Sequence, residues 1–234
     1  LKKYRAVFRT VEAFAATQGL KNLQEIDHTF VDGFRRTRQQ AGRMPKTIYN
    51  ETVLLRELVN FSLRRILLLQ DPLAGYRIRE PRQTPQPCWS PEQVEQILDA
   101  APPHYRPVLT LLADTGVRIG EAQWLTWDDF DGTKIHIRAK EGWNTKTGNI
   151  RAVPLTSRLQ VLLASMPRRA RWVFTAPASK KYPNGDHQIS ARRLLQALKR
   201  VLRDLSLNGH LHTFRHSFVS AAITAGTRGA DRPR

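Results

Sequence analysis

The chain has 234 residues, 41% of them hydrophobic, which is enough for one large domain or, as we prefer, two modest ones. Its 38 Lys and Arg against 20 Asp and Glu give a formal charge of +18, which predicts a polyanionic partner, nucleic acid first, with a merely basic protein such as a ribosomal one as the alternative. The one cysteine, Cys88, excludes an internal disulfide framework and a cysteine-rich zinc site, and no apolar run is long enough to span a bilayer.

Basic residues predominate in both halves of the chain, with 16 against 8 acidic residues in residues 1–90 and 22 against 12 in residues 91–234. Both halves are therefore expected to touch the same phosphate backbone. The amino terminus is amphipathic and lacks a signal-peptide core, so we expect a soluble, cytoplasmic protein with no membrane partner. Because the chain begins at Leu1 without an initiator Met, a fragment that lacks upstream domains is one expectation.

Three helices are predicted in the first region, which has no strand-like alternation. Apolar residues at spacings of three and four indicate helices over residues 3–18, from about Leu23 to Gln40, and from Pro45 onward with a break before Asp71. The core positions expected in the third helix are Ile48, Val53, Leu54, Leu58, Phe61 and Leu68. Residues 1–74 are therefore expected to form a small all-helical domain.

Basic residues on the exposed faces of this domain are candidates for contacting DNA. They are Arg35, Arg36, Arg38, Arg43 and Lys46. The stretch from Asp71 to Ser90 is rich in proline, which favours an extended connector over a packed element, and we place a linker at residues 75–89. This linker adds Arg77, Arg79 and Arg82 to the DNA-binding candidates.

A second domain is predicted over residues 90–234. Ser90, Pro91 and Glu92 supply an N-cap, a first-turn proline and an acidic first turn, so a helix is expected from Pro91 to about Ala101. Further helices are expected near residues 104–114, 118–125, 156–166, 188–206 and 212–225. Alternation predicts strands at 133–139 and 150–155, joined as a hairpin with a long tip, and a short strand at Trp172–Phe174. The predicted fold class is mainly α (α+β), an all-helical first domain followed by a mixed helical domain with a small antiparallel β-sheet.

Two arginines are candidates for binding a phosphate. Cleaving a DNA phosphodiester without a metal requires charge neutralisation around a five-coordinate phosphorus, a nucleophile, and an acid for the leaving oxygen. Arginine suits the first task because its planar fork donates two parallel hydrogen bonds and stays charged. Arg118 stands at a predicted helix start and Arg215 in a later predicted helix, and we expect them to converge on one basic concavity.

Three motifs in order give the sequence a specific resemblance. They are Thr115-Gly116-x-Arg118-x-x-Glu121 with Leu125-x-Trp127-x-Asp129, then Thr145-Lys146-Thr147-Gly148 ahead of Val153-Pro154-Leu155, and then His212-x-x-Arg215-His216-Ser217-Phe218 with Gly226. The first resembles the first-arginine motif of tyrosine recombinases, the phage-integrase family, the second their hairpin lysine, and the third their second-arginine box. The resemblance covers about residues 90–226, and the family would place a helical core-binding domain in front of it.

The resemblance implies a role for each matching position. Arg118 and Arg215 would hold the scissile phosphate and stabilise the phosphorane-like transition state, and Lys146 would protonate the departing 5′ oxygen. His212 would act as general base toward a tyrosine hydroxyl or hold the phosphate. The family forms a 3′-phosphotyrosyl intermediate that stores the bond energy, so no cofactor is expected.

Simpler structural roles exist for several of these residues. Arg118 could be a surface cap after a glycine turn, and Lys146 a solvated turn lysine. Glu121 and Asp129 are expected to pair with nearby backbone or basic groups. Trp124 and Trp127 are expected in the core, and His216 is expected to be buried or to flank a helix.

A metal site is the alternative reading of the histidines near residue 212. Two histidines four apart on a helix, such as His212 and His216, can share a ligand face, and His210 is close by. The Glu of an HExxH motif is absent, and Arg215 would set a permanent positive charge beside the metal. No metal is therefore expected.

The tyrosine nucleophile of the family has no counterpart in the sequence. The tyrosines are Tyr4, Tyr49, Tyr76, Tyr105 and Tyr182, and all precede His212, whereas the family places its tyrosine one to two helices after the second arginine. The sequence thus predicts a recombinase truncated before its tyrosine, with DNA binding retained better than cleavage.

Three functions follow as hypotheses. The first is a site-specific DNA recombinase, such as the integrase of a phage or other mobile element, that holds double-stranded DNA between two basic domains and assembles as a homo-oligomer, a tetramer, on it. The alternative is a non-catalytic DNA-binding or regulatory protein on the same fold. The third is an enzyme similar to type IB topoisomerases, which share the chemistry.

Overall fold

The chain forms two compact units, residues 1–84 and 85–234, and the division falls inside the expected linker. The computed structural model describes residues 2–82, 85–145, 148–168, 170–180, 182–224 and 226. In this part of the chain, no helix combines the length and the apolarity needed to cross a membrane.

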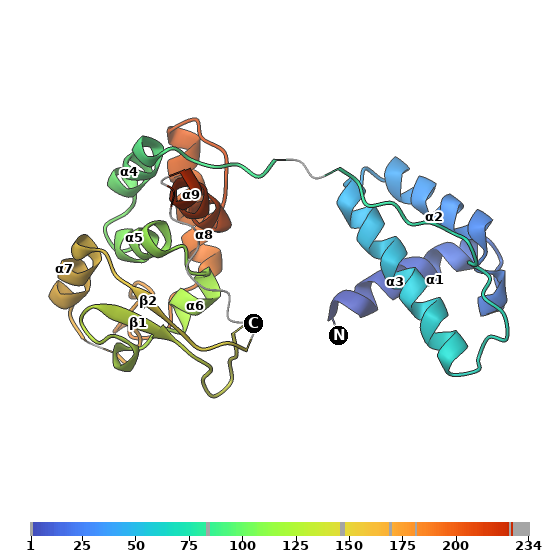
Figure 1. Ribbon diagram of the computed structural model, residues 1–234, viewed down its shortest axis with the longest axis horizontal. Helices are drawn as coiled ribbons and strands as arrows, with labels where there is room; N and C mark the ends of the chain where they lie inside the picture. The colour runs from blue at the N-terminus through green and yellow to red at the C-terminus, as the bar shows by residue number, and fades with distance from the viewer. Residues whose placement is uncertain are drawn as a thin grey trace. The chain divides into compact units, whose positions relative to one another are not determined.

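The first unit is built from three helices, α1 (Lys2–Thr17), α2 (His28–Gln40) and α3 (Pro45–Arg64), with a short 3₁₀ helix η1 (Leu23–Glu25) after α1 (Figure 1). The continuous helix expected from Leu23 to Gln40 is wrong. The Asp27 side chain accepts a hydrogen bond from the Phe30 N–H at 2.8 Å, so Asp27 is an N-cap and α2 begins at His28.

The buried face of α3 differs from the expected one at its end. Leu55 and Val59 are buried in the core of the unit, whereas Phe61 is 47% exposed. Phe61 lies two residues beyond Val59, which places it about 200° around the helix from the buried face. The Arg65 guanidinium lies over the Phe61 ring instead.

Residues 71–76 pack on the first unit, although we expected an extended connector from Asp71. Leu73 is buried among the helices of this unit. Asp71 accepts two hydrogen bonds from Arg56, each at 2.8 Å, and the Tyr76 hydroxyl donates to Asp32 at 2.5 Å. The burial of Leu73 and these polar contacts outweigh the preference of the prolines for an extended, unpacked connector.

The second unit surrounds helix α5 (Arg106–Thr115), which packs against α4 (Pro91–Ala100), α6 (Ile119–Gln123), α7 (Ser157–Ser165) and α9 (Leu211–Thr224). Its Leu109, Leu111 and Leu112 are almost fully buried. Helix α8 (Ala191–Asp204) packs against α4 and α6.

Strands β1 (Lys134–Ile137) and β2 (Arg151–Pro154) form a small antiparallel sheet in which Ile135 pairs with Val153 (Figure 1). The 3₁₀ helix η2 (Trp127–Asp129) precedes β1. The predicted class, mainly helical with a small antiparallel sheet, is confirmed. The strand expected at Trp172–Phe174 is replaced by isolated bridges, Thr126 with Trp172 and Thr175 with Gln188, because its neighbours are loop residues.

Candidate active site

A tight turn between α5 and α6 places Arg118. Helix α5 ends at Thr115, and its C-cap Gly116 turns the chain with a left-handed φ of 61°. The Gly116 N–H donates to the Leu112 carbonyl. Val117 is buried, and Arg118 is the N-cap of α6, as expected of a residue at a helix start. The Arg118 side chain remains 29% exposed. The backbone thus fixes the root of this side chain while its guanidinium reaches the surface.

Helix α9 brings Arg215 to the same turn. Phe214 and Ser217 are buried on the face of α9 that packs on the core, which leaves Arg215 half-buried beside them. The Arg215 Nη1 donates to the Gly116 carbonyl at 2.6 Å, although the two residues are 99 positions apart. Arg118 and Arg215 are therefore both held at this turn.

His212 lies in the first turn of α9, close to both arginines. The pKa of His212 is lowered below its ordinary value, and the largest cause is loss of hydration. Charge repulsion from His210, His216, Arg118 and Arg215 lowers it further. Burial and the charge of Arg118 likewise lower the pKa of Arg215. His212 stands three residues before Arg215 on α9, so the two are neighbours on the surface of this helix. Arg215 in turn bonds the turn that carries Arg118.

Lys146 and Thr147 lie outside the described residues, so the position expected for the hairpin lysine stays a prediction. The neighbouring Thr145 is buried, and its hydroxyl donates to the Asn149 carbonyl at 3.4 Å.

A buried carboxylate, Glu121, holds two arginines beside this site. Its oxygens accept from the Arg118 N–H at 2.8 Å, from Arg118 Nη1 at 3.2 Å, and from Arg151 Nη1 and Nη2 at 3.1 and 2.7 Å. Burial raises the pKa of Glu121, but the hydrogen bonds from Arg151 and Arg118 outweigh it and hold the pKa below its ordinary value. Three guanidinium groups against one carboxylate leave an excess of two positive charges in the cluster of Arg118, Arg151, Arg215 and Glu121.

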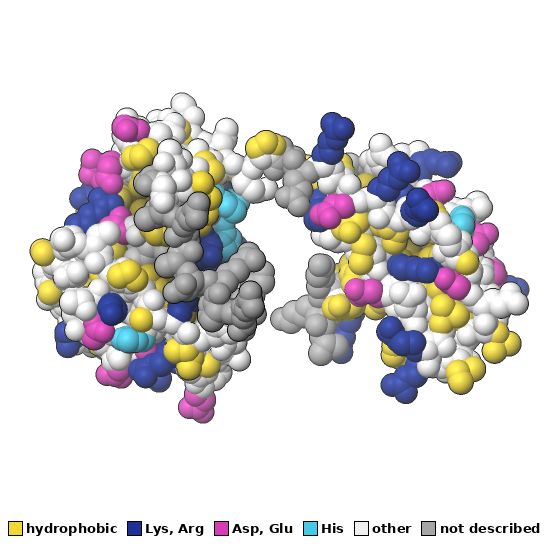
Figure 2. All heavy atoms as spheres, viewed as in Figure 1, with side chains coloured by type: hydrophobic (Ala, Val, Ile, Leu, Met, Phe, Trp, Pro, Cys, Tyr) yellow, Lys and Arg dark blue, Asp and Glu magenta, His cyan; other side chains and the backbone are white. Residues whose placement is uncertain are grey.

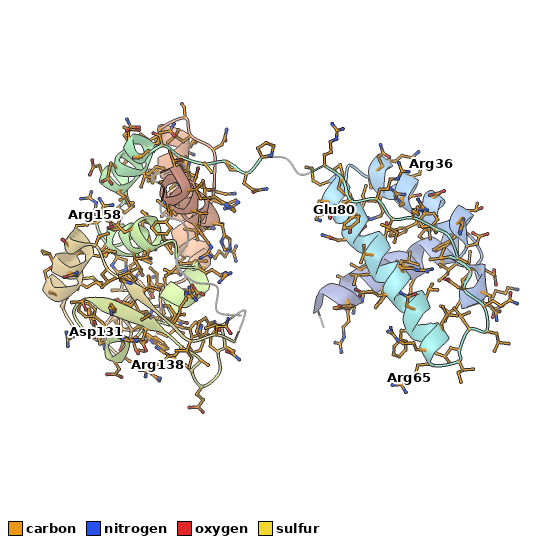
Figure 3. The ribbon with its side chains drawn as sticks, in the orientation of Figure 1. Arg36, Arg65, Glu80, Asp131, Arg138 and Arg158 are labelled. Atoms are coloured by element: carbon orange, nitrogen blue, oxygen red, sulfur yellow. The ribbon has the colours of Figure 1, made fainter. Side chains whose placement is uncertain are left out.

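Asp129 has a structural role, as expected. It is buried, it caps η2 through the Thr126 N–H at 2.9 Å, and it binds both Lys140 and Arg138. Figure 3 places Arg138 and Asp131 at opposite ends of β1. Asp129 therefore fastens the segment that follows β1 to the segment that follows α6.

His210 and His212 pack together at the start of α9. The His212 N–H donates to His210 Nδ1 at 3.1 Å, and the two rings meet edge to face. Across the described ranges, no group of three or more His, Cys, Asp or Glu side chains is placed to hold a metal ion. In Figure 2, histidine side chains lie beside basic ones on the surface of the second unit.

A groove beside His212 was not predicted from the sequence. Its volume is about 650 Å³, and His210 and His212 line one wall. Arg192, Leu195 and Lys199 of α8 line it as well. Their spacing of three and four residues puts them on one face of the helix, which is the signal that would have found this basic groove.

The first unit gathers several of the DNA-binding candidates around one cavity. Arg35, Arg36, Arg43 and Arg79 line a space of about 590 Å³, and Lys46 pairs with Glu80 at its edge. Figure 2 shows Lys and Arg side chains over α2, and Figure 3 places Arg36 and Glu80 at the end of α3 away from Arg65. The remaining candidates, Arg77 and Arg82, are exposed.

Arg38 departs from the expectation of an exposed basic residue. Its side chain is 14% exposed, and its Nε and Nη2 each donate to the buried Glu51 at 2.7 Å. The hydrogen bond to Glu51 raises the pKa of Arg38. This arginine is thus committed to an internal ion pair between α2 and α3.

Known proteins share both the sequence pattern and the fold. The chain is 24% identical to a tyrosine recombinase XerC-like protein of Caldanaerobacter subterraneus, over 96% of this chain and 67% of that protein, and 22% identical to the ICEBs1 integrase of Bacillus subtilis, over 88% and 61%. The chain thus spans about two thirds of the length of these relatives.

Solved structures with similar folds include the Tn1549 transposon integrase in complex with transposon right end DNA, with a TM-score of 0.76, 17% identity, and coverage of 96% of this chain and 81% of that one. A lambda integrase dimer bound to a COC′ core site has a TM-score of 0.71 and 15% identity, over 95% and 82%. The model of the phage integrase family matches residues 89–228, more than half of the sequence. With this match, the chain belongs to the phage integrase family of tyrosine recombinases.

Proposed function

We propose that the chain is the DNA-binding and phosphate-activating part of a site-specific recombinase, an integrase of a phage or other mobile element. Such an enzyme cuts and rejoins double-stranded DNA through a 3′-phosphotyrosyl intermediate. The observation that carries this proposal is the hydrogen bond from Arg215 to the Gly116 carbonyl, at the turn that carries Arg118. His212 lies three residues before Arg215 on the same helix. The relatives named above, which are recombinases and integrases, support it.

The chemistry assigns a task to each residue. The two arginines hold the nonbridging oxygens of the scissile phosphate and stabilise the charge that develops on phosphorus. His212, with its lowered pKa, is suited to accept the proton of an attacking hydroxyl at neutral pH. By resemblance, Lys146 protonates the leaving 5′ oxygen. The excess of two positive charges in the cluster matches a phosphorane-like transition state better than a singly charged diester, which is the requirement for catalysis.

We infer that these 234 residues bind DNA without cleaving it, because all five of their tyrosines precede His212, whereas the family resemblance places the nucleophile after Arg215. Tyr76 hydrogen-bonds Asp32 in the first unit, Tyr105 packs on the core of the second, and Tyr182 stacks on His187 with ring centroids 3.9 Å apart. This inference favours, for these residues alone, the second candidate, a non-catalytic DNA-binding or regulatory protein on the same fold.

Each unit offers its own candidate surface for DNA: the first unit has the cavity at Arg35, Arg36, Arg43 and Arg79. The second unit has the α8 groove and the cluster at Arg118. We also propose that the chain acts in the cytoplasm and assembles as an oligomer on DNA, as do the lambda integrase dimer and the lambda integrase tetramer on a Holliday junction.

Fluorescence anisotropy with labelled duplex DNA at several salt concentrations tests the proposal. We expect affinity to fall steeply with salt, and Arg118→Ala to lower the log–log slope by about 1, the loss of one phosphate contact. Arg158→Ala is the matched control, because Arg158 is bound by Glu95 and Asp114 and should leave the slope unchanged. Binding that does not depend on salt would contradict the proposal.

A further inference from the structure

The guanidinium groups of Arg151 and Arg118 both donate to the Glu121 carboxylate, and Arg151 makes more of these hydrogen bonds than Arg118. Both terminal nitrogens of Arg151 donate to Glu121, one to each oxygen, whereas the Arg118 guanidinium donates through Nη1 alone, at the longer distance of 3.2 Å. When the bond from the backbone N–H of Arg118 is included, each carboxylate oxygen of Glu121 accepts two hydrogen bonds, which fills the lone pairs of the group. Within the described part of the chain, Nε and Nη2 of Arg118 make no hydrogen bond.

Without Arg151, the Glu121 carboxylate would bind the Arg118 guanidinium and make it unavailable to a phosphate. It stands three residues after Arg118 and is 2% exposed, so an unshared carboxylate at this position would draw the arginine into a two-pronged pair. Such a pair neutralises both charges and occupies the nitrogens that a phosphate needs. Arg151 reaches the carboxylate from β2, on the far side of the hairpin.

We infer that Arg151 is a positioning residue for Arg118. The Arg151 guanidinium occupies most of the Glu121 carboxylate, so this carboxylate can orient Arg118 through Nη1 alone. Nε and Nη2 of Arg118 are then left to bind a phosphate. This inference rests on the proposed function, because it assumes that Arg118 binds phosphate. It also links the hairpin to the phosphate site, since Arg151 is a residue of the strand that follows the tip.

Two other roles of Arg151 predict different results. Arg151 could contact a phosphate directly, in which case its contribution to DNA affinity is independent of Arg118. It could also serve only to neutralise a buried carboxylate, in which case its removal lowers stability and changes DNA affinity only through unfolding.

A double-mutant cycle on the affinity for duplex DNA separates these roles. Arg118→Ala and Arg151→Ala should each weaken binding by roughly 3- to 10-fold, the loss of about one phosphate contact. In the Arg118→Ala background, Arg151→Ala should add less than about a twofold loss, because its effect passes through Arg118. Losses that multiply would overturn the inference and leave the proposed function standing. Unchanged binding by Arg118→Ala would overturn the proposed function and the inference together.

The titration of His212, followed by NMR of its ring protons, gives a readout that a purely structural role would not move. In Arg151→Lys the charge is kept but the fork is lost, so Arg118 closes on Glu121 and its field at His212 weakens. We expect the pKa of His212 to rise in the folded Arg151→Lys variant, with thermal unfolding confirming that the variant is folded.

Arg138→Lys is the matched control, because Arg138 also bonds a buried carboxylate, that of Asp129, from the same hairpin. It should leave the titration of His212 where it is. An unchanged His212 titration in Arg151→Lys, or an equal change in Arg138→Lys, would show that Arg151 does not act through Arg118.

Discussion

Phe218 of α9 lies against the bare backbone of Gly116, so closely that a Cβ added to Gly116 would stand 2.6 Å from the Phe218 Cδ1 atom. Gly116 also has a φ of 61°, a conformation that a residue with a side chain adopts only under strain. The turn that carries Arg118 can therefore contact α9 only with glycine at position 116.

Gly116→Ala should lower the free energy of unfolding of the second unit by about 2 to 4 kcal/mol, the sum of backbone strain and overpacking. All five tryptophans lie in residues 89–172, so tryptophan fluorescence during urea unfolding reports on this unit alone. Gly132→Ala is the control, because Gly132 has a φ of 98° but open space around it, and it should cost only about 1 kcal/mol. Equal losses in the two variants would show that Phe218 is not the constraint.

Arg38→Ala should lower the stability of the first unit by about 3 kcal/mol, because it leaves the buried Glu51 without its partner. Circular dichroism should show an earlier melting step while the tryptophan transition stays in place. Arg36→Ala, on the exposed side of the same helix, should instead weaken DNA binding and leave melting unchanged. A large loss of DNA affinity in a folded Arg38→Ala protein would contradict the internal role.

His212 should make stability fall as the pH drops below about 6.5, its ordinary pKa. Its pKa is lowered in the folded state, so between that lowered value and the ordinary one the unfolded chain binds more protons and stability rises with pH. The loss should be complete once the pH is below the folded pKa. Urea unfolding of the protein and of His212→Gln at several pH values measures the difference, and a difference that does not change with pH from 7 to 5 would contradict it.

The 234-residue chain should form no covalent complex with a nicked suicide substrate, because covalent catalysis needs a hydroxyl positioned at the phosphate. Adding a family-like carboxy-terminal segment with its tyrosine should give a protein–DNA adduct on a denaturing gel. Arg118→Ala or Arg215→Ala should then reduce the adduct by roughly 100-fold or more while binding changes much less. An adduct of the unmodified chain that maps to Tyr182 would refute the claim that the nucleophile is absent.

Local signals gave much of the fold. Ser90 followed by Pro91 marks the start of α4, where the Ser90 hydroxyl accepts from the Gln93 N–H as an N-cap should. Where the predicted elements were wrong, the cause was the side chain of a single residue. The cap at Asp27 divides a run that is helical by periodicity, and Leu73 draws a proline-rich stretch onto the first unit.

The candidate site was only partly readable because its partners are distant in sequence. Arg118 and Arg215 could be named from their motifs, but Arg151 could not, since its partner Glu121 lies 30 positions earlier. A signal existed nonetheless. On β2, Arg151 shares the more buried face with Val153, and a charged side chain on that face of a strand indicates a buried partner of opposite charge.

Trp89, near the start of the second unit, is hydrogen-bonded to residues near the end of that unit. Its N–H donates to Ser217 of α9 at 2.8 Å and its indole N–H to the Asn208 carbonyl at 2.9 Å, across 128 and 119 positions. During synthesis, a chain that has not yet exposed α9 outside the ribosome lacks both partners, so this core is completed late and over a long loop. The same helix carries His212 and Arg215, so a nascent chain brings Arg215 to the turn of Arg118 only at the step that completes this core.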